Sequence, residues 1–266
     1  FTPIMKTLRF AAMALIAATV SGAATSCDDE GRADGSRPLM TDEAATKRLV
    51  TLYCPEEGGS LMFSYDADGR LQVIAEDWGW YTNTCEWQAG EVSLGGSDFF
   101  SLDGELVTTA PGGGRYGELH LSYDSDGKLQ KVESASGFFA RYYWEGDRLA
   151  RLADDANIDY RLYYSGKSCK GYAPFLVPNM FIQTSLALAH PELFGLLTGQ
   201  LPDSVCYHTY YTQRGATYYS YTLDDDGYLA SATEYDGRDA PHPVTRYYTW
   251  ELPTQRIPAT YPPTRG

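Results

Sequence analysis

Aspartate and glycine residues recur in this chain at a spacing that could bind a cation. Five residues match positions 1, 3, 5, 6 and 12 of an EF-hand calcium loop: Ser122, Asp124, Asp126, Gly127 and Glu133. Position 1 is a serine, however, and the related run at 64–75 ends in Ala75, which offers no ligand oxygen. The flanking residues alternate as in strands, whereas an EF-hand needs helices. A β-turn explains the run better, with Asp124 and Asp126 accepting bonds from nearby backbone amides and Gly127 at positive φ.

Aromatic residues offer a second kind of chemistry, because flat rings can stack on sugar rings. Aromatics make up 14% of the chain, with 22 tyrosines. Trp78 and Trp80 lie two residues apart and share a face if the segment is extended. With Tyr81 and the acids Glu76 and Asp77 they form a candidate glycan-binding site. The alternative is that aromatics are good strand formers that cover a wide sheet.

Motifs for catalysis are missing from the sequence. It contains no GxSxG elbow, HExxH pair, phosphate loop or dinucleotide fingerprint. His120, His190, His208 and His242 lie in unlike contexts, and most carboxylates lie in turns. We therefore expect a protein that is not an enzyme and has no cofactor, with a hydrolase as the least favoured alternative.

The N-terminal region has the features of a secretory signal peptide. Lys6 and Arg9 precede an apolar run of about eleven residues, too few to span a bilayer, and then small residues up to Cys27. We expect residues 1–26 to be the signal peptide, with Phe1–Ile4 as an upstream extension. Residues 24–27, ATSC, resemble the lipobox of bacterial lipoproteins, in which the cysteine is lipidated, although leucine is commonest where Ala24 stands. The acidic residues 28–30 resemble the export signal of Bacteroidetes lipoproteins.

The net charge of the chain limits the classes of molecule that it can bind. The net charge of −14 becomes −16 without Lys6 and Arg9, and an acidic protein repels nucleic acid. The expected partners are a membrane, through the lipid on Cys27, and a glycan or an envelope protein. The expected location is the outer membrane, at the cell surface or facing the periplasm.

The remaining four cysteines are disulfide candidates, because an even number in an exported protein suggests pairing. Three pairings are possible. We expect Cys169 to pair with Cys206, because these two cysteines bracket the apolar insert at 175–199. Free thiols are the alternative, and a zinc site is less favoured because no two cysteines have the close spacing of metal ligands. The candidates are Cys54, Cys85, Cys169 and Cys206.

A repeated hairpin must position all these residues. LSYDSDGKLQKV at 121–132 nearly repeats FSYDADGRLQVI at 63–74, and four further copies align on glycines with a period near 20 residues, which fits one β-hairpin. In three copies the leucine after the turn is followed three residues later by another apolar residue: Leu71 and Ile74, Leu129 and Val132, and Leu149 and Leu152. An odd step cannot share one face of a regular strand, so we expect a β-bulge there or a leucine that closes the hairpin end. The further turn glycines are Gly104, Gly146, Gly166 and Gly227.

One segment breaks the β pattern. The insert at about 175–199 has apolar residues at helical spacing, and Pro191 lacks an amide proton. We expect one helix to stop near Ala189 and a second to start at Pro191, together plugging or covering a curved sheet. Thr41 could cap another short helix.

The repeats resemble the tyrosine-aspartate repeats of Rhs-type shell proteins. The whole layout of lipobox, degenerate hairpins, apolar helical insert and late copy SYTLDDDGYLASA is similar to a family of Bacteroidetes lipoproteins described as having a porin-like fold. The resemblance covers roughly residues 40–250, and its motif is specific for hairpins; it implies no catalytic residues.

The predicted fold is mainly β, an antiparallel, strongly curved meander or half-barrel of hairpins around a small helical insert. A lipidated Cys27 and an acidic tether occupy 27–38, a single domain occupies 39–252, and a proline-rich tail occupies 253–266. The predicted function is a non-enzymatic binding or scaffolding module anchored to a membrane of the cell envelope, and the alternative is a glycan-binding accessory lipoprotein.

Overall fold

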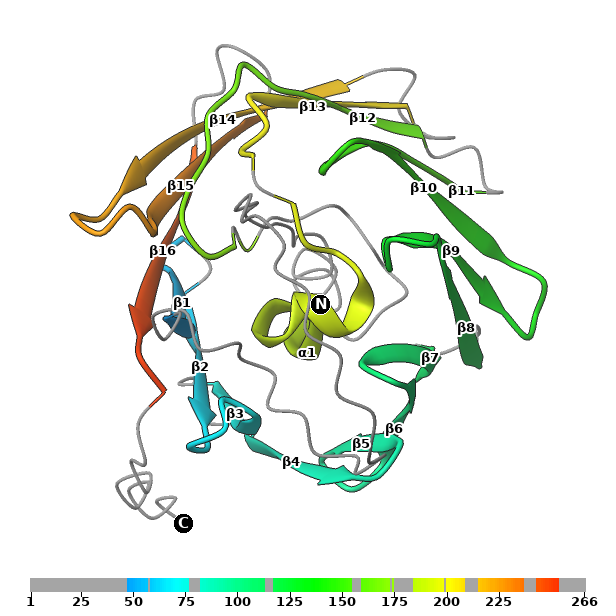
Figure 1. Cartoon of the computed structure of the whole chain (residues 1–266). Helices are drawn as coiled ribbons and strands as arrows, with labels where there is room; N and C mark the ends of the chain where they lie inside the picture. Colours follow the sequence, from blue (N-terminus) through cyan, green and yellow to red (C-terminus); the bar gives the residue numbers. More distant parts are fainter. Residues whose placement is uncertain are drawn as a thin grey trace, which may run out of the picture.

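The chain folds as a closed β-barrel. The computed structural model describes residues 47–56, 58–76, 82–112, 117–154, 159–172, 174, 184–198, 200–208, 215–236 and 243–253. Within these ranges sixteen antiparallel strands follow one another around a ring, and the last strand pairs with the first (Figure 1). The strands are β1 (Arg48–Cys54), β2 (Gly59–Tyr65), β3 (Leu71–Glu76), β4 (Thr82–Gln88), β5 (Glu91–Leu94), β6 (Asp98–Asp103), β7 (Leu106–Pro111), β8 (Glu118–Tyr123), β9 (Leu129–Ser134), β10 (Phe139–Glu145), β11 (Arg148–Asp154), β12 (Asp159–Tyr163), β13 (Ser204–His208), β14 (Gly215–Leu223), β15 (Leu229–Asp236) and β16 (Val244–Glu251).

The expected open meander or half-barrel is therefore wrong in one respect, because the sheet closes. Closure joins Leu49 to Trp250 and Tyr53 to Tyr247 as cross-strand partners. It gives the backbone groups of both end strands hydrogen-bonding partners and removes the exposed edges that an open sheet would have.

Tight turns join the repeated hairpins as the sequence predicts. The carboxylate Oδ1 of Asp124 accepts hydrogen bonds from the backbone N–H of Asp126 and of Lys128, both at 2.9 Å. Asp66 and Asp224 make the equivalent pairs of bonds. The predicted positive φ of the turn glycines is confirmed at Gly69 (76°), Gly104 (61°), Gly127 (75°), Gly146 (57°), Gly166 (93°) and Gly227 (89°).

The predicted bulges are also present. In β3, Leu71 pairs with Tyr65 while Val73 pairs with Ser64, so Gln72 is an extra residue. Each such residue directly follows a buried leucine or valine, which explains the odd apolar step in the sequence. The described strands contain six of these extra residues: Val50, Gln72, Thr108, Ala150, Gln130 and Ala230.

At every one of these bulges an aromatic side chain satisfies a backbone carbonyl. The indole N–H of Trp87 donates to the carbonyl of Leu71 at 2.8 Å, and the hydroxyl of Tyr164 donates to that of Leu149 at 2.9 Å. We call these contacts aromatic latches, since each ties one hairpin to a later one. The other four are Tyr65 to Leu49, Tyr123 to Val107, Trp144 to Leu129 and Trp250 to Leu229.

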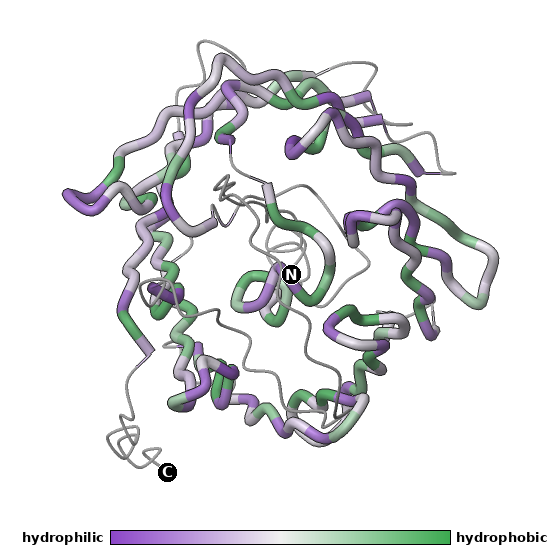
Figure 2. The backbone as a smooth tube through the Cα atoms, viewed as in Figure 1, coloured by the Kyte–Doolittle hydropathy of each residue, from purple (hydrophilic) through white to green (hydrophobic). Residues whose placement is uncertain are grey.

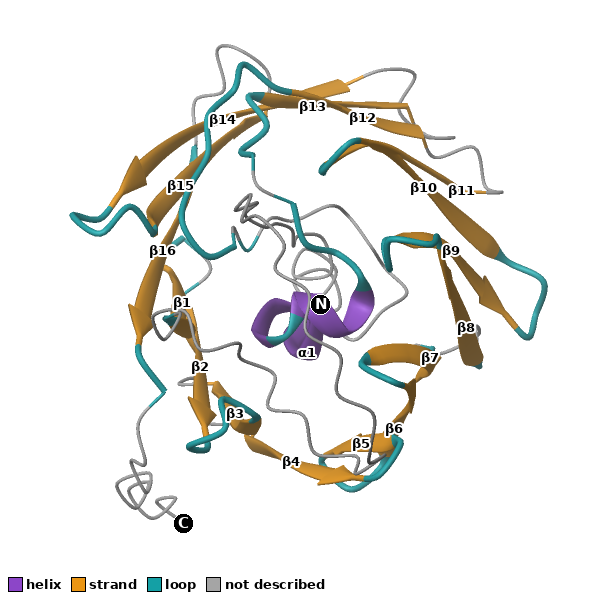
Figure 3. Cartoon of the chain, in the orientation of Figure 1, coloured by secondary structure: helices purple, strands orange, loops and turns teal. Residues whose placement is uncertain are grey.

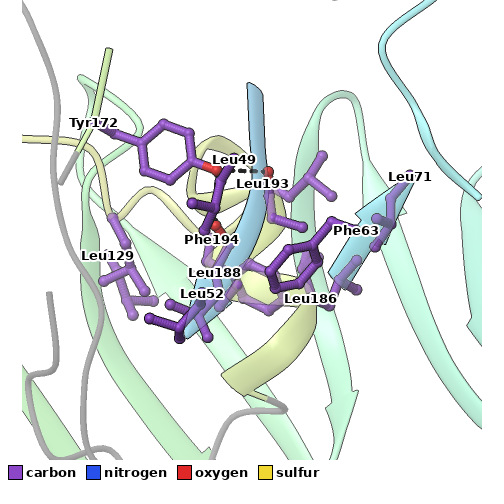
Figure 4. Packing of buried hydrophobic residues seen from close by; sticks show 14 of the residues in the cluster. Leu49, Leu52, Phe63, Leu71, Leu129, Tyr172, Leu186, Leu188, Leu193 and Phe194 are labelled. Carbon is purple, nitrogen blue, oxygen red and sulfur yellow. Dashed lines mark hydrogen bonds between the residues drawn. The ribbon is translucent and has the colours of Figure 1, made fainter. Parts of the chain in front are cut away.

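The described part of the apolar insert, residues 184–198, lies inside the ring of strands (Figure 3). Helix α1 (Thr184–Ala189) ends before His190, and the short 3₁₀ helix η2 (Pro191–Phe194) follows, which confirms the predicted break. We call residues 184–198 the plug. Its side chains pack against inward-facing strand residues (Figure 4), with Phe194 edge-on to Phe100 at 6.2 Å between ring centroids. The backbone N–H of Leu129 also donates to the carbonyl of Gly195 at 3.0 Å.

Several expectations lie outside the described residues: the signal peptide, the tether, the helix capped by Thr41, and all of the tail except Pro253. No helix in the described part of the chain is long and apolar enough to cross a membrane.

Candidate functional site

A cluster of charged and polar groups, with Arg48 and His190 buried and Glu192 half-buried, fastens the plug to the barrel wall. Arg48, at the start of β1, places its guanidinium 2.6 Å from Glu192 Oε1 on η2. The same carboxylate oxygen lies 2.9 Å from Nδ1 of His190. His190 is fully buried, and its ring meets Tyr65 and Trp87 edge-on. We call Arg48, His190 and Glu192 the plug lock.

The hydrogen bonds of His190 define which of its ring nitrogens accepts and which donates. The backbone N–H of Leu71 donates to Nε2 at 3.0 Å, so Nε2 must present a lone pair. The proton therefore lies on Nδ1 and is donated to Glu192. His190 thus bridges the β3 backbone and the η2 carboxylate, and Arg48 balances the negative charge of Glu192.

This environment sets the ionisation of Glu192. Burial alone would raise the pKa of the carboxyl, but His190 and the positive charge of Arg48 together lower that pKa to about 2. The pKa of Arg48 is raised despite burial, because Glu192 stabilises the charged guanidinium. The cluster is thus a permanent ion pair at neutral pH.

A second feature is the part of the inner wall formed by β12 to β16. Its inward-facing side chains are largely polar, whereas those of the rest of the described interior are mainly aliphatic. Tyr219 and Tyr221 stack with 7° between their planes and 6.2 Å between centroids. Arg246 and Glu234 form a 2.9 Å ion pair beside them. These residues alternate with outward-facing ones and share the inner face with buried neighbours such as Ala232 and Trp250. We call the set the tyrosine wall: Tyr160, Tyr207, Tyr219, Tyr221, Glu234 and Arg246.

Burial raises the pKa of the tyrosines in this wall. The pKa of Tyr160 rises to about 12, with smaller contributions from Asp154 and Tyr207. Their hydroxyls therefore keep their protons at neutral pH and act as hydrogen-bond donors, as Tyr221 does toward the carbonyl of Pro202 at 2.6 Å. The wall offers neutral rings and hydroxyls together with one ion pair.

The residues proposed for glycan stacking cannot be placed together. Asp77, Trp78, Trp80 and Tyr81 lie outside the described residues. Glu76 ends β3 and is half-buried, on the same face as its inward-facing partner Leu61.

The four disulfide candidates are free thiols in the structure, so the expected pairing of Cys169 with Cys206 is not present in it. Cys54 and Cys169 are buried, while Cys85 and Cys206 are half-buried on β4 and β13. Burial raises the pKa of the Cys85 and Cys169 thiols to about 12, so neither is a ready nucleophile.

Sequence reasoning missed the plug lock. It treated His190 only as one of four histidines in unlike contexts, yet ALAHPELF at 187–194 places a histidine and a glutamate in the most apolar segment of the domain. Polar groups on such a background need buried partners, which was the available signal. Arg48 gave no signal, since only the fold brings it to the insert.

Few side chains among the described residues are placed where they could act as catalytic groups. His190 is fully buried, and both His190 and Glu192 are engaged in the hydrogen bond and ion pair of the plug lock. Across the described ranges no three His, Cys, Asp or Glu residues are grouped so as to hold a metal ion.

Comparisons with known proteins find the fold but no family. No family model matches the chain, and no curated protein matches it. A solved porin-like protein from Bacteroides uniformis is similar, with 16% identity, a TM-score of 0.53, and alignment over 78% of this chain and 96% of that one. A porin-like protein from Bacteroides vulgatus has 12% identity, a TM-score of 0.52, and alignment over 76% and 98%. The chain therefore has the barrel fold of these two porin-like proteins.

Proposed function

We propose that the protein is a non-enzymatic binding module of a bacterial cell envelope, held to a membrane by lipid on Cys27, with its barrel standing in water. The observation that carries this proposal is the polarity of the two faces of the wall. A transmembrane barrel has an apolar outer band about 25 Å tall and a polar interior. Here the buried aliphatic residues face inward and pack on the plug, as Leu49, Leu71 and Leu129 do (Figure 4).

The outer face carries charges in the middle of strands. Glu86 on β4, Glu133 on β9 and Arg141 on β10 are exposed, on the opposite face from buried neighbours. Arg161 on β12 is exposed in the same way. A lysine or arginine facing lipid at the bilayer midplane costs about 2–4 kcal/mol, so such a wall is unsuited to hydrocarbon.

The plug argues against a role as an open pore. It lies within the ring of strands, is held by the plug lock, and packs tightly through Leu186, Leu193 and Phe194, each at most 1% exposed. Solute passage along that part of the interior would require breaking a buried ion pair. The porin-like fold thus supports a binding or scaffolding role in which the barrel is a rigid support.

The lipid anchor carries the membrane attachment in this proposal, which makes it testable. Cells expressing wild-type protein and Cys27→Ser should be fractionated after labelling with an alkyne fatty acid. Wild type should be labelled and sediment with membranes, while Cys27→Ser should be unlabelled and remain in the supernatant. Sedimentation of unlabelled Cys27→Ser that only detergent reverses would contradict the proposal, because the barrel itself would then be embedded. A Cys206→Ser variant is the matched control and should behave as wild type.

A further inference from the structure

The outer wall of the barrel is divided into a charged part and an uncharged part. From β13 through β16 and on through β1 to β3, seven neighbouring strands, the described outward-facing residues carry no aspartate, lysine or arginine, and their one glutamate is Glu251 at the end of β16. The orientation follows from strand alternation and from cross-strand partners, which share a face. Arg48 at the start of β1 is the exception, because it pairs with Glu251 but its guanidinium contacts Glu192 of the plug. The outward residues of what we call the neutral face are Ser204, Cys206, Ala216, Tyr218, Ser220, Thr222, Ser231, Thr233, Tyr235, Thr245, Tyr247, Thr249, Thr51, Tyr53, Ser60, Met62, Ser64, Val73 and Ala75, with His208 and Glu251 at strand ends.

This composition is unusual for a chain in which 21% of residues are charged. Strands β8 to β12 carry outward charges along their length, including Lys131, Glu133 and Arg151. Strands β14 to β16 are instead largely pale in Figure 2, the shade of intermediate hydropathy that serine, threonine and tyrosine have. The neutral face is therefore neither a solvated charged surface nor an apolar one.

Exposed tyrosine rings form its centre. Tyr53 on β1 and Tyr247 on β16 are cross-strand partners, stacked with 6.3 Å between centroids and 30° between planes. Their residues are 42% and 48% exposed, so ring surface is available to a ligand. Thr249, two residues along β16, is exposed on the same side.

Rows of hydroxyl groups flank the rings and are ordered by one another. Thr233 and Thr245 are 3.1 Å apart across β15 and β16, and Thr222 and Ser231 are 2.7 Å apart across β14 and β15. A hydroxyl has one donor and two acceptor positions, so each paired hydroxyl keeps capacity for a further partner. The face thus presents a preorganised grid of hydroxyls beside stacked rings.

The chemistry of the face selects one kind of occupant. A charged partner would find no opposite charges in the body of the face. Protein hot spots favour arginine, tryptophan and tyrosine and disfavour serine and threonine, and this face has tyrosine alone of the favoured three. A lipid surface would need more aliphatic side chains than Met62 and Val73. An uncharged, polyhydroxylated chain with flat apolar ring faces matches both the rings and the hydroxyls.

We propose that the neutral face binds an uncharged glycan, with sugar rings stacked on Tyr53 and Tyr247 and sugar hydroxyls bonded to the neighbouring threonines and serines. This inference rests on the proposed function, since it names the ligand class of a non-enzymatic module whose barrel wall stands in water. It places the site on the outside of β16, β1 and β15, away from the plug.

Affinity electrophoresis of the native protein tests it, in gels that contain a neutral polysaccharide (mannan, xyloglucan, mixed-linkage β-glucan or starch) or the acidic polygalacturonate. At least one neutral polysaccharide should retard wild type, and polygalacturonate should not. The double variant Tyr53→Ala/Tyr247→Ala should weaken that retardation on the order of tenfold in apparent Kd. The matched control is Phe99→Ala/Tyr143→Ala, which removes two rings of similar exposure (51% and 40%) from β6 and β10, outside the neutral face, and should bind as wild type.

A second variant separates loss of binding from loss of folding. Thr249→Glu leaves both tyrosines in place and adds a charge to the exposed edge of the face, so it should also weaken retardation while near-ultraviolet circular dichroism stays as in wild type. Three outcomes would overturn the inference: no retardation by any of the neutral polysaccharides, equal loss in the control, or wild-type dimers in sedimentation that Tyr53→Ala/Tyr247→Ala converts to monomers. The last would make the face an interface between copies. None of these outcomes affects the fractionation of Cys27→Ser, so a failure of this inference can be distinguished from a failure of the proposed function.

Discussion

At the scale of single residues, the plug lock shows why a buried ion pair can be retained inside an aliphatic core. Burying Glu192 and Arg48 separately would cost several kcal/mol each, and their attraction offsets this only with good geometry and further hydrogen bonds. His190 supplies such a bond to Glu192 while accepting one from Leu71. The lock therefore gives the plug one orientation that apolar packing alone would not specify.

Replacing Glu192 with glutamine should leave Arg48 buried without a counterion and reduce the free energy of unfolding at pH 7 by about 3–5 kcal/mol. The folded-state pKa of Glu192 is lowered to about 2 from an ordinary value near 4.5. Its contribution is therefore complete above about pH 4.5 and is lost as pH falls toward 2. Urea titrations of both proteins between pH 7 and pH 2.5 check this. A difference that stays constant across the range would show that Glu192 acts through packing and not through its charge.

Two glycines separate the effect of backbone conformation from that of close contact. Both have positive φ, 75° at Gly127 and 57° at Gly195. A Cβ at Gly127 would meet only Leu106 at an ordinary 3.7 Å, whereas a Cβ at Gly195 would stand 2.2 Å from the carbonyl oxygen of Gly127.

Gly127→Ala should therefore cost about 1 kcal/mol of unfolding free energy, from the conformational penalty alone. Gly195→Ala should cost distinctly more, because the plug must move away from the β8–β9 turn. Thermal melts of the two variants compare them directly, and EDTA should leave both unchanged, since Asp124 already accepts two backbone amides. Equal losses would mean that the plug is not seated on this turn.

At the scale of elements, the aromatic latch explains why the repeat conserves its spacing within this chain. A bulge takes a carbonyl out of the regular ladder, and a buried carbonyl without a partner costs free energy. The next hairpin supplies an aromatic donor about 15 or 16 residues later in five of the six cases. The bulge and the aromatic residue thus act together to link successive hairpins.

Tyr164→Phe should remove one latch without altering the packing of the ring. Loss of its hydrogen bond to Leu149 should lower the unfolding free energy by about 1 kcal/mol. Tyr163→Phe, one residue earlier and 51% exposed, is the matched control and should be neutral within about 0.5 kcal/mol. Chemical denaturation of both variants measures the difference, and the idea fails if the exposed position costs as much as the latch.

At the scale of the whole molecule, local sequence patterns predicted the individual turns, bulges and helix break better than they predicted the closure of the barrel. The turn glycines, the bulges after leucine and the break at Pro191 all follow from chemistry within a few residues. Hairpins such as β4–β5 and β5–β6 lack the full aspartate-glycine motif, so the number of strands could not be counted from the repeat. The pairing of Leu49 with Trp250 joins the two ends of the domain, and no local signal encodes it. The plug lock was hidden for the same reason, because Arg48 and Glu192 are 144 residues apart.

Closure should make the barrel depend on its last strand. β16 pairs with both β15 and β1 and contributes Tyr248 and Trp250 to the core, each at most 7% exposed. A chain ending at residue 243 should lose these contacts, open the β1 edge and show no cooperative thermal transition. A chain ending at Pro253 loses only the rest of the proline-rich tail and should melt within about 2 °C of the full chain. Retention of a cooperative transition by the shorter chain would mean that β1 to β15 fold as an open sheet and that closure is not required for stability.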